Sequence, residues 1–91
     1  MPSIHIRTEH NLDLTTARER IEHVAAQLKE RLGVSYNWSG NELHINRTGA
    51  SGTILVEEKA VTADVKLNMM LTSFKDQVER QLKEFLHQNL A

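Results

Sequence analysis

The chain of 91 residues contains no cysteine. Disulfide bonds, thiol nucleophiles and cysteine-ligated metal sites are therefore excluded. An excess of charge of one sign is also missing, because 11 lysine and arginine residues stand against 12 aspartate and glutamate residues. Nucleic acids and anionic membrane surfaces are bound through clustered positive charge, so this balance argues against both kinds of partner.

Long apolar runs are missing as well. No run approaches the ~20 apolar residues that a membrane-spanning helix needs. The N-terminus leads directly into a strand pattern, without the basic region and apolar stretch of a signal peptide. We therefore expect a cytoplasmic protein without a membrane span, and the length predicts a single domain over residues 1–91.

What the sequence does contain is an ordered series of two periodicities. Residues 3–8 and four short segments within residues 34–67 alternate apolar and polar side chains, which is typical of half-buried strands. Two stretches with apolar residues three and four apart, one before and one after residues 34–67, indicate amphipathic helices. The order βαββββα predicts an α+β fold.

The helix ends have recognisable signals. Asp13 can cap the first helix, Thr16 with Glu19 offers a capping box one turn later, and Gly33 suits its C-terminal end. Thr72 or Ser73 is expected to cap the second helix. The apolar stripe predicted for that helix consists of Phe74, Val78, Leu82, Phe85, Leu86 and Leu90.

Three turns set the strand registers. We predict two-residue turns at Gly40-Asn41 and Glu58-Lys59, and a four-residue loop over residues 48–51. Glu58-Lys59 is the least favourable of these turns, because neither residue favours positive φ. Together the turns place one apolar set on one face of the sheet: Val34, Tyr36, Trp38, Leu43, Ile45, Ile54, Val56, Val61, Ala63, Val65 and Leu67. The other face is polar apart from Leu55.

The connections predict the topology. The fifth strand runs antiparallel beside the first, which gives a five-stranded antiparallel sheet in the order 1-5-4-3-2 with two helices on one face. This is the plan of the TBP-like, or helix-grip, class. In larger members of that class a ligand cavity separates the last helix from a curved sheet.

Beyond topology, the chain resembles a family of small bacterial proteins, the polyhydroxyalkanoic acid system (granule-region) proteins. The resemblance runs from end to end and rests on a series of short motifs. They are Ile4-His5-Ile6, Ala17-Arg18 with Glu22, Tyr36-Asn37-Trp38, Gly40 followed by Leu43-His44, Arg47-Thr48-Gly49, Gly52-Thr53-Ile54, Val65-Lys66-Leu67, Met70-Leu71 and Phe74-Lys75. The resemblance implies a cytosolic accessory protein linked to storage granules, and it supplies no catalytic residues.

The sequence shows no constellation that would make an enzyme or a metal site. His5 and His44 fall on strands separated by two others, too far apart to share an ion. There is no Gly-x-Ser-x-Gly elbow and no phosphate-binding glycine-rich loop. We therefore expect no catalytic residues, no cofactor and no metal. Arg7, Lys66 and Arg47 on the polar face are too few to follow a nucleic-acid backbone.

Two sets of apolar residues are candidates for binding. Met69, Met70 and Leu71, with Phe74, form a predicted interaction patch where the sheet ends, because flexible methionines suit adaptable apolar contacts. The alternative is that they close the core. The second set is a predicted cavity lining under the last helix. It consists of Tyr36, Trp38, Phe74, Val78 and Leu82, for which ordinary core filling is the alternative.

The first strand and the second (residues 34–39) are predicted sheet edges without proline or lysine, so two copies could pair edge to edge as a homodimer. A monomer mass at every concentration in sedimentation would contradict this.

Two functional hypotheses follow. The first is a non-enzymatic accessory or interaction protein that contacts a granule surface or a granule-associated protein. The second is a small apolar-ligand binding module of helix-grip type.

Overall fold

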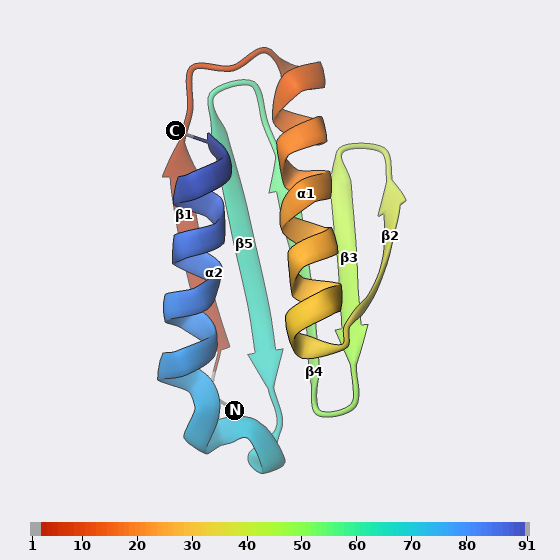
Figure 1. Cartoon of the computed structure of the whole chain (residues 1–91), viewed down its shortest axis with the longest axis vertical. Helices are drawn as coiled ribbons and strands as arrows, with labels where there is room; N and C mark the ends of the chain where they lie inside the picture. The colour runs from red at the N-terminus through yellow and green to blue at the C-terminus, as the bar shows by residue number, and fades with distance from the viewer. Residues whose placement is uncertain (1–2, 91) are drawn as a thin grey trace.

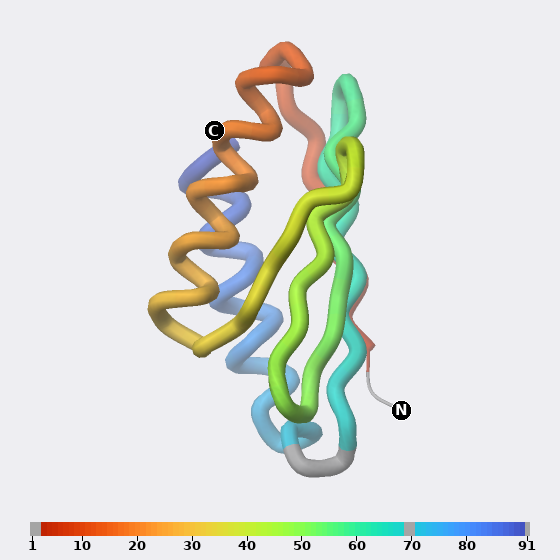
Figure 2. Tube along the Cα trace, turned by 90° about the vertical axis from the view of Figure 1, so that its right-hand side faces the viewer, coloured from red at the N-terminus to blue at the C-terminus, as the bar shows by residue number. Residues whose placement is uncertain are grey.

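The computed structural model describes residues 3–90, without the side chains of Met69 and Met70. The elements are β1 (Ser3–Glu9), α1 (Leu14–Leu32), β2 (Ser35–Ser39), β3 (Glu42–Arg47), β4 (Ala50–Val56), β5 (Ala60–Leu67), the 3-10 helix η1 (Met69–Phe74) and α2 (Lys75–Leu90). The strands form one antiparallel sheet in the order β1-β5-β4-β3-β2, and both helices cover the same face (Figures 1 and 2). The predicted α+β topology is confirmed.

Helix α1 begins and ends as its caps predict. The Asp13 carboxylate accepts a hydrogen bond from the Thr16 backbone N–H at 2.7 Å, and these Thr16 interactions lower the pKa of Asp13 below its usual value. Gly33 takes the left-handed conformation with φ of 69° and donates to the Lys29 carbonyl at 3.0 Å. Of the two predicted starts, the Asp13 cap is therefore the one that the chain uses.

Two hairpins have the predicted register. Trp38 lies opposite Leu43 across the Gly40-Asn41 turn, and Val56 lies opposite Val61 across the Glu58-Lys59 turn. The second turn is closed by a hydrogen bond from the Glu57 N–H to the Ala60 carbonyl at 2.8 Å. It needs no positive φ, since only glycines have one among residues 3–90.

The hairpin between β3 and β4 differs from the prediction. Arg47 pairs with Ala50 rather than with Gly52, so the expected loop over residues 48–51 is a two-residue turn of Thr48 and Gly49. Gly49 permits this turn with a φ of 90°. The shift is two residues, an even number, so the apolar residues Leu43, Ile45, Ile54 and Val56 keep their predicted face. It moves Gly52 to a position opposite Ile45.

Helix α2 lies beside α1 and antiparallel to it (Figure 1). Its side chains Leu82, Phe85, Leu86 and Leu90 are buried, as the apolar stripe predicts. The first residue of the predicted stripe, Phe74, is not buried. It is the last residue of η1, which precedes α2, and it is 49% exposed. The predicted caps Thr72 and Ser73 are wrong for the same reason: both residues belong to η1, and the Thr72 hydroxyl donates to the Asn68 carbonyl at 3.1 Å.

Candidate functional site

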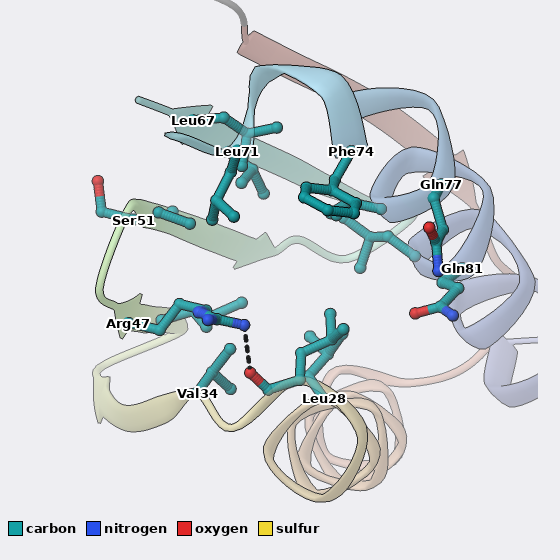
Figure 3. A pocket seen from close by; sticks show the side chains of 16 residues that line it. Leu28, Val34, Arg47, Ser51, Leu67, Leu71, Phe74, Gln77 and Gln81 are labelled. Atoms are coloured by element: carbon teal, nitrogen blue, oxygen red, sulfur yellow. Dashed lines mark hydrogen bonds between the residues drawn. The ribbon is translucent and has the colours of Figure 1, made fainter. Parts of the chain in front are cut away.

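A pocket of about 300 Å³ opens between the two helices and the sheet (Figure 3). The end of α1 forms one side, η1 and the first turns of α2 form the other, and strands β3, β4 and β5 form the floor. Its lining consists of Leu28, Leu32, Val34, Ile45, Arg47, Ala50, Ser51, Gly52, Val65, Leu67, Leu71, Phe74, Gln77, Val78, Gln81 and Leu82. Most of these side chains are apolar, so the pocket is suited to hydrocarbon groups.

Gly52 forms part of the pocket floor. It lies between Ile45 on β3 and Val65 on β5, and it places no side chain on the helix side of the sheet. A Cβ atom there would lie 2.7 Å from the backbone oxygen of Asp64 and 2.9 Å from Val65 Cγ2. The strands approach too closely for any larger residue at this position. Because glycine has no side chain, nothing projects from position 52 into the pocket.

The mouth of the pocket carries an exposed aromatic ring. Phe74 lines the pocket and is 49% exposed. The one other large apolar side chain that is exposed in the described part of the chain is Leu55, at 38%, on the opposite face of the sheet. The helix side therefore has its exposed apolar surface beside the pocket.

Arg47 stands at the edge of the pocket nearest the end of α1 (Figure 3). Its Nη1 donates to the Leu32 carbonyl at 2.8 Å, and its Nε donates to the Thr48 carbonyl at 3.3 Å. It forms no salt bridge with any described residue. Its predicted place on the polar face is wrong, because Arg47 lies two residues after Ile45 on β3 and so shares its face.

Gln81 supplies a polar atom on the other side. Its Oε1 is buried and accepts no hydrogen bond from the described residues. In Figure 3 the Gln81 side chain comes from α2 and lies across the pocket from Arg47. Buried acceptors without a donor are uncommon, because they lose their hydration without replacement.

Only part of the predicted cavity lining faces the pocket. Val78, Leu82 and Phe74 line the pocket, whereas Tyr36 and Trp38 do not. Both of these aromatic residues donate to the Glu22 carboxylate on α1, the Tyr36 hydroxyl at 3.2 Å and Trp38 Nε1 at 2.8 Å. Partial burial, together with the Glu22 charge, raises the pKa of Tyr36 above its usual value.

The predicted interaction patch is described only in part. Leu71 packs against the core and lines the pocket together with Phe74. The side chains of Met69 and Met70 lie outside the described residues.

Three of the five histidines have described partners. His5 pairs with Asp64, and His44 lies 3.3 Å from a Glu42 oxygen. The buried His10 accepts from the Leu12 N–H through Nδ1, and its Nε2 is 2.9 Å from the Glu57 carbonyl. No three histidine or acidic side chains are placed to hold a metal ion within the described chain.

Among residues 3–90, no helix has the length and apolar character to cross a membrane.

Arg47, Gly52 and Gln81 line the pocket although they were not among the predicted site residues. Strand alternation carries a signal for Arg47, since Leu43, Ile45 and Arg47 share one face. Gln81 precedes the buried Leu82 on α2 and carries no signal in the sequence pattern.

Comparison with models of protein families gives a match over nearly the whole chain. A family model described as "Putative polyhydroxyalkanoic acid system protein" covers residues 4–90. Neither the curated proteins nor the solved structures contain a match.

Proposed function

Because the chain belongs to the "putative polyhydroxyalkanoic acid system protein" family, we propose that it is a non-enzymatic accessory protein of that system. It acts by contacting the polyester surface of storage granules. The observation that supports this is the exposed Phe74 ring beside an apolar pocket. Exposed apolar surface of this kind suits attachment to an apolar partner.

The chemistry of the lining supports a binding role rather than catalysis. Among the described lining residues, Arg47 is the only one with an ionisable side chain. Its guanidinium stays protonated in proteins. No general acid or base therefore faces the pocket, and a catalytic site needs such groups in reach of its substrate.

Co-sedimentation with polyhydroxyalkanoate granules stripped of other proteins tests the proposal. We expect binding that persists as the salt concentration rises, because apolar contacts are not screened by ions. Full burial of a phenylalanine side chain is worth about 1.5–3 kcal/mol, and Phe74 is 49% exposed. Phe74→Ser should therefore weaken granule binding about 3–10-fold.

Leu55→Ser is the matched control, since Leu55 is the exposed apolar residue of the opposite face. It should leave granule binding unchanged. Equal losses in the two variants, or no binding of the unmodified protein at any salt concentration, would contradict direct contact through Phe74. A pull-down from storage-accumulating cells would then identify a granule-associated partner.

The pocket favours a second candidate function, the binding of a small apolar ligand. Its volume of about 300 Å³ lies at the lower end of the range for ligand sites, roughly 300–1,000 Å³. Protein purified from its native host should carry an apolar molecule that native mass spectrometry detects. Val78→Phe should fill the pocket and remove that mass, while Leu55→Phe should not. A mass that persists in Val78→Phe would place the ligand elsewhere.

A further inference from the structure

We propose that the pocket binds a short linear hydroxyacyl oligomer by its two ends. The free carboxylate lies at Arg47, and the terminal hydroxyl donates to Oε1 of Gln81. This inference rests on the second candidate function, ligand binding in the pocket, and assigns the chemical class of the ligand.

The guanidinium of Arg47 is positioned to bind an anion. Its hydrogen bonds to the Leu32 and Thr48 carbonyls hold the guanidinium at the edge of the pocket, and a guanidinium has further N–H groups beyond these two. No aspartate or glutamate belongs to the described lining. A carboxylate that enters the pocket therefore meets an unpaired cation whose planar N–H groups match its two oxygens.

The side-chain oxygen of Gln81 is able to accept a hydrogen bond from a ligand. Its Oε1 is buried in the pocket wall and has no partner among residues 3–90. Gln81 as a whole is only half-buried and lines the pocket, so rotation of its amide can turn this acceptor toward a ligand hydroxyl and satisfy it. An analogue without the hydroxyl would leave it unsatisfied, and sites with buried polar groups discriminate strongly against such analogues.

The positions of the two groups restrict the ligand. Arg47 extends from β3 and Gln81 from α2, on opposite sides of the pocket, with apolar side chains between them (Figure 3). A simple fatty acid has a carboxylate but no second polar end. A single 3-hydroxy acid has both groups close together at one end. A short chain of ester-linked hydroxyacyl units has a carboxylate at one end, a hydroxyl at the other and small apolar branches between them.

Isothermal titration calorimetry of the full chain with the linear trimer of 3-hydroxybutyrate tests the proposal. We expect saturable binding that weakens about tenfold or more in Arg47→Gln, with partial retention in Arg47→Lys. The trimer methyl ester should bind the unmodified protein about as weakly as the free trimer binds Arg47→Gln. The ester should lose little more on that substitution, because it has already lost the same interaction.

A second cycle of this kind, which combines a change in the ligand with a change in the protein, tests the hydroxyl end of the trimer. The O-acetylated trimer should bind the unmodified protein weakly, and Gln81→Leu should no longer distinguish acetylated from free trimer. Arg7→Gln is the control, since Arg7 is a cation on the opposite face of the sheet that pairs with Glu9. It should leave the affinity unchanged. Thermal melting of every variant separates lost binding from lost folding.

Two outcomes would overturn the inference. No saturable binding of the trimer is one. The other is equal binding of the free, esterified and acetylated trimers in a pocket that Val78→Phe blocks. That second result would leave the apolar-ligand function standing and remove only the recognition of the two ends. Granule co-sedimentation is independent of either result.

Discussion

Replacement of Leu86 by alanine should remove a large part of the stability of the fold. Leu86 is fully buried on α2 and belongs to the common core with the sheet. Removal of a buried leucine side chain typically costs about 2–5 kcal/mol through lost burial and the cavity left behind. Small domains have about 5–15 kcal/mol in total. The melting temperature should fall by at least about 8 °C.

Urea denaturation followed by circular dichroism measures the change in the free energy of unfolding. Leu55→Ala provides the matched control, because it removes the same atoms from a leucine that is 38% exposed. That variant should lose clearly less, about 1 kcal/mol, because part of the Leu55 side chain is already in water. A loss at Leu86 no greater than the loss at Leu55 would show that α2 does not pack on the sheet as described.

Replacement of Gly52 by valine should also be severe, and the order of a small series identifies the cause. The first side-chain atom would lie 2.7 Å from the Asp64 backbone oxygen, which belongs to the paired strand β5. Overpacking of this kind costs about 1–3 kcal/mol and occasionally more. We expect unfolding free energies that fall in the order glycine, alanine, valine.

Intrinsic strand preference predicts the reverse order, since valine favours strands and glycine does not. Denaturation midpoints of the three proteins therefore decide between steric clash and propensity. Ser51→Ala is the control on the neighbouring, exposed residue, and its effect should lie within about 0.5 kcal/mol. Equal or rising stability from glycine to valine would mean that β4 and β5 can move apart at this point.

Much of the fold could be predicted because the signals are local and consistent. The Asp13 and Gly33 caps bound α1, and alternation within each strand assigns its faces. The loop between β3 and β4 could not be predicted in the same way. A four-residue loop and a two-residue turn differ by an even shift, so both place Leu43 and Ile45 on the buried face, and hydrophobic pattern alone cannot separate them.

The pocket was harder to predict than the sheet. Its floor depends on which residue lies opposite Gly52, and that depends on the same ambiguous turn. The exposure of Phe74 depends on η1, a short 3-10 segment whose residues also fit the first turn of a regular helix. Tyr36 and Trp38 are inner-face residues as expected, but β2 is an edge strand, which places them under α1 and away from the pocket.

The contact between Trp38 and α1 gives the molecule an internal optical reporter. Trp38 is the only tryptophan. Its indole N–H donates to Glu22, and the Arg18 guanidinium lies 4.8 Å from the ring centre. Fluorescence of this single residue therefore reports the separation of α1 from the edge strand β2, at the opposite side of the sheet from β1 and α2 (Figure 1). Emission and helical circular dichroism thus observe different parts of one unfolding transition, and their coincidence or divergence measures how cooperatively the two halves of the sheet are joined.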